Sequence, residues 1–188
     1  MSDTARITAS YGRHYTVRTE SGQTYTATAR GKRVDFACGD RVHIEVQNGE
    51  QAVIRDFLPR RSLLYRQDAW RTKLIAANVD QLFIVTAAVP SPSEMLLQRA
   101  LLAAEAGGIE AFIVLNKTDL RGSLPNDEFR RLGIKTIIRT SAEHNTGIHE
   151  LLDAVCTEIP IVHDKSAGDS IKVALIGRPN VGKSSLFN

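Results

Sequence analysis

The order of two short motifs constrains the fold of this 188-residue chain more than any other feature. VLNKTDL occupies residues 114–120, and GRPNVGKSS occupies residues 177–185. The second motif has the GxxxxGK[ST] spacing of a phosphate-binding loop, which connects a strand to a helix. The first has the NKxD spacing that reads guanine in GTPases, where it normally follows the phosphate loop. The reversed order is what results if such a domain is cut open and its ends are rejoined, so that the last strands come first.

The first third of the chain has the rhythm of short β-strands. Between Arg6 and Leu58, polar and apolar residues alternate in runs rich in Thr, Tyr, Val and Ile, and the turn pairs Ser21-Gly22 and Asn48-Gly49 separate some of the runs. This pattern predicts about five short antiparallel strands. Five strands suit a small closed barrel of the OB type, which leaves no unpaired edge; a small open sandwich is the alternative.

The pattern changes after residue 73. Continuous apolar runs of strand length alternate with helical stretches such as EMLLQRALLAAEAG, which follows a Ser cap and ends at Gly107 and Gly108. Strands are expected at VDQLFIVTAAV, IEAFIVL, IKTIIRTSA and IKVALIG, and further helices around residues 128–132 and at GIHELLDAVCTEI, with residues 163–170 as a polar connection. Apolar strands that alternate with helices predict a parallel sheet covered on both faces.

The residue types of the phosphate-loop motif suit phosphate chemistry. Gly177 and Gly182 let backbone N–H groups converge on a phosphate at a helix N-terminus. Lys183 would neutralise β- and γ-phosphate charge, and the hydroxyl of Ser184 would hold Mg²⁺. The alternative is a glycine turn beside a surface lysine.

The NKTD motif adds base selectivity. The carboxylate of Asp119 can accept two hydrogen bonds from the N1–H and amino group of guanine, whereas adenine would leave it unpaired. Lys117 can lay its methylene stem along the base, and Asn116 can tie this loop to the phosphate loop. The TSA segment, residues 140–142, offers the backbone of Ser141 and Ala142 to the guanine carbonyl. The alternative role for Asp119 is that of a helix cap. The predicted nucleotide-binding set is Asn116, Lys117, Asp119, Ser141, Ala142, Gly177, Asn180, Val181, Gly182, Lys183, Ser184 and Ser185, with no catalytic residue assigned.

Charge and cysteine content bound the partners. The formal net charge is +3, yet Arg55 to Lys73 alone holds six basic residues and two acids, which makes an anionic partner plausible for this segment. Cys38 and Cys156 are too few for a disulfide framework, and the longest apolar run is too short to cross a membrane. We expect a soluble, cytoplasmic protein. His144 and His149 are expected to be solvated, because nothing near them completes a metal set.

These motifs resemble those of the ribosome small subunit-dependent GTPase A family, circularly permuted GTPases with an N-terminal OB domain. The resemblance rests on GRHYTVRTESG, GDRVHIEV, RRSLLYRQDAWRTKLIAANVDQLFIV and VLNKTDL. It implies GTP and Mg²⁺ as ligands, binding of a monomer to the 30S ribosomal subunit and 16S rRNA, and GTP hydrolysis late in small-subunit maturation. We expect an OB-type β-barrel over residues 1–60, a basic linker over residues 61–73 and an incomplete, circularly permuted GTPase domain of the α/β class over residues 74–188.

Two features depart from that family. Residues from about 130 to 188 look more like the junction of the tandem-G-domain ribosome assembly GTPases, in which Asn180 would match a potassium ligand; an ordinary turn asparagine is the alternative. In addition, no DxxG and no zinc domain follow Asn188, so the resemblance implies a C-terminally truncated chain with an incomplete hydrolytic site and zinc only in an absent domain. The alternatives are therefore a truncated or chimeric fragment that only binds RNA, and a tandem-type fragment fused to a foreign N-terminus.

Overall fold

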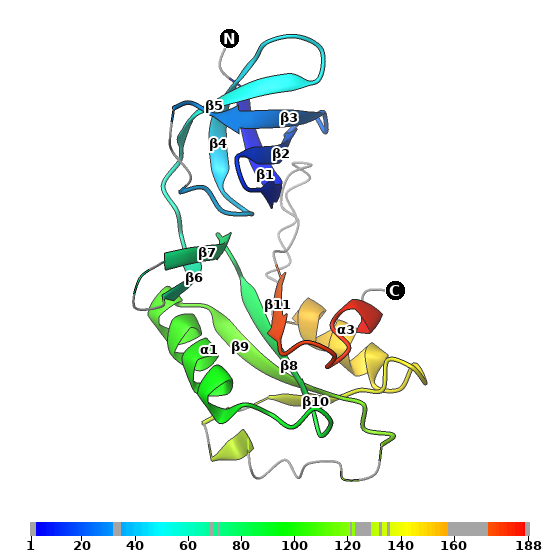
Figure 1. Cartoon of the computed structure of the whole chain (residues 1–188). Helices are drawn as coiled ribbons and strands as arrows, with labels where there is room; N and C mark the ends of the chain where they lie inside the picture. The colour runs from blue at the N-terminus through cyan, green and yellow to red at the C-terminus, as the bar shows by residue number, and fades with distance from the viewer. Residues whose placement is uncertain are drawn as a thin grey trace. The chain divides into compact units, whose positions relative to one another are not determined.

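The computed structural model describes residues 3–31, 35–67, 70, 72–120, 122, 129–131, 133–134, 136–157 and 173–186. These residues form two compact units, and the chain passes from the first to the second between Val79 and Asp80. Figure 1 shows a β-rich first unit and a second unit in which helices flank a sheet. Within the described residues, no helix is long and apolar enough to span a membrane.

The first unit is built on a closed five-stranded barrel, as the sequence predicts. The strands are β1 (Asp3–Tyr11), β2 (His14–Thr19), β3 (Thr24–Ala29), β4 (Arg41–Val46) and β5 (Gln51–Phe57), and their order around the barrel is β1-β2-β3-β5-β4. The expectation of antiparallel pairing was wrong for one pair, because β3 and β5 run parallel. A closed ring of five strands cannot alternate in direction all the way round.

Alternate residues of these strands fill the barrel. Tyr15 packs edge-on against Phe36, with ring centroids 5.7 Å apart, and Phe36 packs in the same way against Phe57 at 5.9 Å. The buried core of the barrel comprises Ala5, Ile7, Tyr15, Val17, Ala27, Phe36, Val42, Ile44, Ala52 and Ile54.

A β-hairpin occupies most of the segment that the sequence presents as a basic linker. Its strands β6 (Leu63–Gln67) and β7 (Thr72–Ala77) pair antiparallel. The N–H of Ala77 donates to the carbonyl of Cys38 at 2.8 Å, and the side-chain amide of Asn78 donates to the carbonyl of Gly39 at 3.0 Å. Gly39 has a φ of +91°, and a Cβ there would collide with the Ala77 carbonyl oxygen, so this close approach needs glycine. The end of the hairpin is therefore fastened to the barrel.

The second unit contains the predicted parallel sheet. Its strands are β8 (Gln81–Ala87), β9 (Glu110–Asn116), β10 (Ile137–Arg139) and β11 (Val173–Gly177), in the order β10-β9-β8-β11 with every neighbouring pair parallel. Every residue of the central strand β8 is buried, as expected for a strand covered on both faces.

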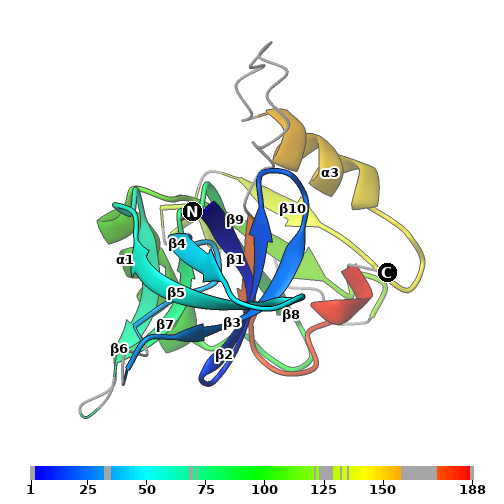
Figure 2. The same cartoon turned by 90° about the horizontal axis from the view of Figure 1, so that it is seen from above.

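Helices cover both faces of this sheet, as Figures 1 and 2 show. Helix α1 (Glu94–Gly107) begins at the expected cap Ser93 and ends at Gly108, which has a left-handed φ of 60°. Helix α3 (Ile148–Thr157) packs through Leu151 on the face that carries Phe83 and Phe112, whose rings stack at 4.8 Å.

Two further segments were expected from the sequence. Of the short helix around residues 128–132, Phe129 and Arg130 are helical, whereas residues 128 and 132 lie outside the described residues. The polar connection at residues 163–170 lies outside them as well.

Candidate nucleotide-binding site

The two motifs meet at one edge of the parallel sheet. Strand β9 ends at Asn116, β11 ends at Gly177, and both pair with the central strand β8 in the same direction. The carboxyl ends of the strands therefore lie side by side, and loops at this edge of an open α/β sheet are where ligands bind. The permuted order of the motifs in the chain is thus compatible with one shared site.

The side chain of Asn116 joins three segments at this edge. Its amide nitrogen donates to the carbonyl of Val181 in the phosphate loop at 2.9 Å. Its amide oxygen accepts from the hydroxyl of Thr140 and the N–H of Ala142, both at 3.1 Å. Asn116 and Val181 are buried, so these bonds are shielded from water. The tie between the NKTD segment and the phosphate loop that the sequence predicts is confirmed.

Asp119 lies beside Asn116 with its carboxylate partly exposed. Its Oδ1 accepts a hydrogen bond of 2.5 Å from the hydroxyl of Ser141, and the Nε2 of His144 lies 3.8 Å from Oδ2. The bond from Ser141 is the main reason that the pKa of Asp119 lies below its ordinary value of 3.8; a backbone hydrogen bond, His144 and Lys117 act in the same direction against partial burial. The carboxylate is therefore ionised at neutral pH and can accept hydrogen bonds.

The backbone N–H groups of the TSA segment already donate hydrogen bonds within the protein, which the sequence does not suggest. The N–H of Ser141 donates to the carbonyl of Thr146 at 2.9 Å, and the N–H of Ala142 bonds to Asn116. The backbone donors assigned to a guanine carbonyl thus have partners within the protein. Thr140 and the hydroxyl of Ser141 are supporting groups that sequence reasoning missed, since a three-residue motif does not show which atoms bond across the sheet.

Neighbouring atoms approach the phosphate loop so closely at both of its motif glycines that a larger side chain would not fit there. A Cβ at Gly177 would collide with the carbonyl oxygen of Val85 on β8, and one at Gly182, where φ is +90°, would collide with the amide nitrogen of Asn116. The Nζ of Lys183 donates to the carbonyls of Gly177 at 3.1 Å and Arg178 at 2.7 Å. The ammonium group therefore lies over its own loop, where a bound phosphate would offer it a stronger partner.

The rest of the loop follows the expected course. Asn180 adopts a left-handed conformation with a φ of 64°, which suits a turn asparagine. The helix expected after the loop begins as the single 3₁₀ turn η1 (Ser184–Leu186), and residues 187 and 188 lie outside the described residues.

A small open pocket of about 70 Å³ lies between the motifs. It is lined by Asn116, Lys117, Asp119, Ser141, Ala142, Glu143, Gly182 and Ser185. Seven of these eight residues belong to the predicted set, and Glu143 is an addition. The other predicted residues, Gly177, Asn180, Val181, Lys183 and Ser184, form the phosphate loop beside the pocket. The structure thus brings the three predicted segments together.

No protein-only metal centre is present in the described part of the chain, where no three His, Cys, Asp or Glu side chains cluster. Ser184 supplies one hard oxygen ligand of the kind that Mg²⁺ accepts. Magnesium held there would take its remaining ligands from phosphate oxygens and water, as is usual for nucleotide-bound magnesium.

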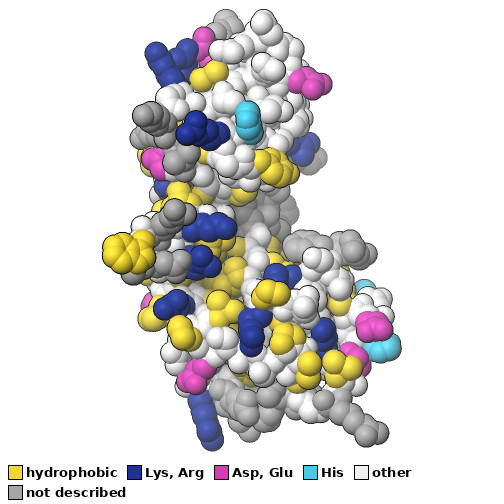
Figure 3. Space-filling model, viewed as in Figure 1, with side chains coloured by type: hydrophobic (Ala, Val, Ile, Leu, Met, Phe, Trp, Pro, Cys, Tyr) yellow, Lys and Arg dark blue, Asp and Glu magenta, His cyan; other side chains and the backbone are white. Residues whose placement is uncertain are grey.

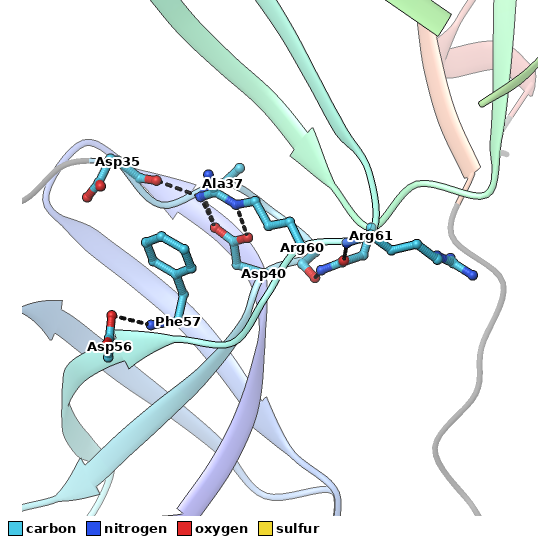
Figure 4. Close-up of polar contacts among 9 residues, drawn as sticks. Asp35, Ala37, Asp40, Asp56, Phe57, Arg60 and Arg61 are labelled. Atoms are coloured by element: carbon cyan, nitrogen blue, oxygen red, sulfur yellow. Dashed lines mark hydrogen bonds and ion pairs between the residues drawn. The ribbon is translucent and has the colours of Figure 1, made fainter. Parts of the chain in front are cut away.

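The basic segment of the first unit is partly neutralised by acids from elsewhere in the barrel. Figure 4 shows the ion pair of Arg60 with Asp40, in which Nε donates to Oδ1 and Nη2 donates to Oδ2, both at 2.7 Å. This bond raises the pKa of the Arg60 guanidinium, which also lies 4.6 Å from the centre of the Phe57 ring. Arg55 pairs with Glu45. Asp40 and Glu45 lie outside the segment and offset half of its local excess of four positive charges. Among the described side chains on the face drawn in Figure 3, Lys and Arg are interspersed with other residues and form no continuous patch.

Comparison with known proteins places the chain in a family. The model of the RsgA GTPase family matches residues 57–188. A protein of Neisseria meningitidis serogroup B named small ribosomal subunit biogenesis GTPase RsgA is 78% identical over the whole chain, and its namesake in Nitrosomonas europaea is 40% identical over 98% of it. The chain spans 57% and 56% of these relatives, or about half of their length.

Solved structures agree with the fold. YjeQ from Thermotoga maritima superimposes with a TM-score of 0.67 at 26% identity, covering 100% of this chain and 64% of YjeQ. YloQ, described as a circularly permuted GTPase, has a TM-score of 0.61 and covers 98% of this chain and 63% of its own. Its identity of 22% supports likeness of fold alone.

A closed barrel followed by a parallel sheet, with the NKTD motif ahead of the phosphate loop, defines an OB-type barrel joined to a circularly permuted P-loop GTPase domain. The chain belongs to the RsgA GTPase family. Because the family match runs to residue 188 and the Neisseria relative aligns with the entire chain, the residues after 130 share this parentage. The expected kinship of that part with tandem-G-domain GTPases is thereby corrected.

Proposed function

We propose that this chain supplies the guanine-nucleotide site and the RNA-binding barrel of a GTPase that acts in maturation of the small ribosomal subunit. The observation that carries the proposal is the amide of Asn116, which bonds to the phosphate loop at Val181 and to the TSA segment at Ala142. One buried side chain thus couples the base-reading and phosphate-reading parts of a single site. The names of the relatives supply the biological process.

In this proposal the residues divide the work as follows. Lys183 exchanges its loop carbonyls for β- and γ-phosphate oxygens, and the hydroxyl of Ser184 holds Mg²⁺. Asp119 accepts the N1–H and amino group of guanine, and Lys117 packs along the base. Magnesium, when bound, offsets negative charge on the phosphates during hydrolysis of GTP to GDP. Asn180 is a candidate potassium ligand, which a comparison of GTP hydrolysis in KCl and NaCl tests.

The barrel has a separate task in this proposal. Residues 1–60 contact 16S rRNA in the 30S subunit, residues 61–73 add basic groups to that contact, and residues 74–188 bind nucleotide in a monomeric, cytoplasmic protein. The second candidate function is an RNA-binding module without hydrolysis. The closed barrel and the basic segment favour it. A steep fall of 30S affinity with salt, with no dependence on GTP analogues, would support the module instead of the switch.

Base-selective binding is the decisive test of the nucleotide site. A fluorescent guanine nucleotide is titrated into the chain with GDP, ADP and xanthosine diphosphate as competitors. We expect saturable binding that GDP displaces at least a hundredfold better than ADP, because adenine leaves the charge of Asp119 unpaired.

Asp119→Asn serves as the matched variant. Its amide should lose guanine selectivity and accept xanthine, whose 2-oxo group can receive the amide N–H. Equal displacement by GDP and ADP in the unaltered chain would refute guanine recognition. A variant that still prefers guanine would remove Asp119 from the base-reading role.

A further inference from the structure

The two carboxylate oxygens of Asp119 have different surroundings. Oδ1 accepts the short bond from the hydroxyl of Ser141. Oδ2 faces the Nε2 of His144 at 3.8 Å, which is within ion-pair range but too long for a hydrogen bond. The carboxylate is therefore anchored through one oxygen and has its second oxygen beside an imidazole.

The side chain of His144 is mostly exposed to solvent, so few neighbours restrict its position relative to that oxygen. Its side chain is 61% exposed, against 22% for Asp119, and it belongs to the turn that separates Ser141 from Thr146. The groups around it include Asp119 from the segment after β9, together with Lys117 and Glu143, which line the same pocket. A neutral imidazole has little attraction to Oδ2, whereas an imidazolium would form a charge-assisted hydrogen bond with it.

Guanine needs the oxygen that His144 faces. Its N1–H and amino group point the same way and match the two oxygens of one carboxylate. Oδ1 keeps a second lone pair beside its bond from the neutral Ser141 hydroxyl, whereas an imidazolium on Oδ2 would compete with the base for that oxygen and offset the negative charge that attracts the base. We propose that His144 is a positioning residue that competes with guanine for Oδ2 of Asp119, an inference that rests on the proposed guanine site. Protonation of His144 would therefore weaken nucleotide binding. A mildly acidic solution would thus release nucleotide from this site.

The carboxylate of Asp119 does not change charge in the pH interval of this proposal. Burial aside, the Ser141 bond and the neighbouring positive groups keep the pKa of Asp119 below 3.8, so its carboxylate stays ionised between pH 5.5 and 7.5. Histidine is the side chain whose ordinary charge change falls in this interval. Nucleotide phosphates titrate there as well, but they do so equally for every protein variant.

The experiment compares the affinity for fluorescent GDP at pH 7.5 and pH 5.5 in three proteins: the unaltered chain, His144→Gln and His149→Gln. Glutamine keeps a polar side chain that carries no charge, and His149, on α3, controls for loss of an imidazole elsewhere in the unit. We expect the unaltered chain and His149→Gln to lose affinity about three- to tenfold more than His144→Gln on acidification. Parallel losses in all three would overturn the inference.

A second readout needs no nucleotide. The carboxyl ¹³C signal of Asp119 reports its titration directly, and in His144→Gln its pKa should rise toward 3.8 because one positive neighbour is lost. An unchanged titration would show that the pair does not form and would overturn the inference. Absence of guanine binding at pH 7.5 would overturn the proposed function, and the inference with it, whereas binding with parallel pH profiles would overturn the inference alone.

Discussion

Asp40 in the barrel unit and Asp119 in the α/β unit are both hydrogen-bonded carboxylates, yet they differ in burial and in how much of their acceptor capacity the protein uses. Asp40 is fully buried and accepts from two nitrogens of Arg60 and from the N–H of Ala37 at 2.8 Å. Asp119 is partly exposed, is bonded through one oxygen to Ser141, and lines a pocket. The protein uses the acceptor oxygens of Asp40, whereas those of Asp119 keep lone pairs for a ligand.

The difference separates a structural charge from a binding charge. A buried carboxylate is tolerable only when its partners replace the lost water, so Asp40 is matched by a guanidinium and a backbone donor. A base-reading carboxylate must be ionised, oriented and still accessible. The hydroxyl of Ser141 meets this requirement because it lowers the pKa of Asp119 without covering both oxygens.

Of the substitutions that test this comparison, Asp40→Asn should lower the stability of the fold the most. The substitution leaves the guanidinium of Arg60, whose side chain is only 17% exposed, without its charge partner. We expect a loss of about 3–5 kcal/mol in the free energy of unfolding, measured by urea denaturation.

A double variant isolates the cause of that loss. In Asp40→Asn with Arg60→Met neither charge remains buried, so part of the stability should return. A loss below about 1 kcal/mol in the single variant would mean that water replaces the carboxylate and that the pair is not structural.

Ser141→Ala should have a smaller effect, confined to the binding carboxylate. Without the hydroxyl, the pKa of Asp119 should rise toward 3.8, as a carboxyl ¹³C titration would record. Since the folded-state pKa of Asp119 is lowered, its ionisation stabilises the fold above about pH 3.8 and this stabilisation is lost as the pH falls through the lower folded value. The unaltered chain should therefore lose more stability than Ser141→Ala on acidification through this range. Equal acid sensitivity would contradict the assigned role of the hydroxyl.

The sequence predicts the parts of this comparison that depend on local pattern. Period-two runs with glycine turns predict the five-stranded barrel, and apolar runs alternating with helices predict the parallel sheet. NKTD at the end of one strand and GRPNVGKS at the end of another predict that Asn116 and the phosphate loop meet, because carboxyl ends of parallel strands share an edge.

The sequence does not predict what depends on partners far apart in the chain. Arg60 counts as one more positive charge in a basic segment until the fold brings Asp40 to it. The sequence does not predict the β6–β7 hairpin, because residues 68–71, Asp-Ala-Trp-Arg, contain no glycine or Asn-Gly turn signal. The hydroxyl bond from Ser141 to Asp119 joins the ends of two different strands, and neither strand specifies it alone.

Arg55→Ala provides the smallest expected effect and the sharpest control. Arg55 pairs with Glu45 across neighbouring strands β5 and β4, but the two side chains are 38% and 46% exposed. Water and salt screen such a pair, so its removal should change the free energy of unfolding by no more than about 1 kcal/mol in urea denaturation. The same substitution leaves Glu45 unpaired near the basic segment and so lowers the local positive charge. If RNA contacts this segment, 30S affinity should fall and its salt dependence should weaken. A stability loss equal to that of Asp40→Asn would mean that burial does not distinguish the Arg55–Glu45 pair from the Arg60–Asp40 pair.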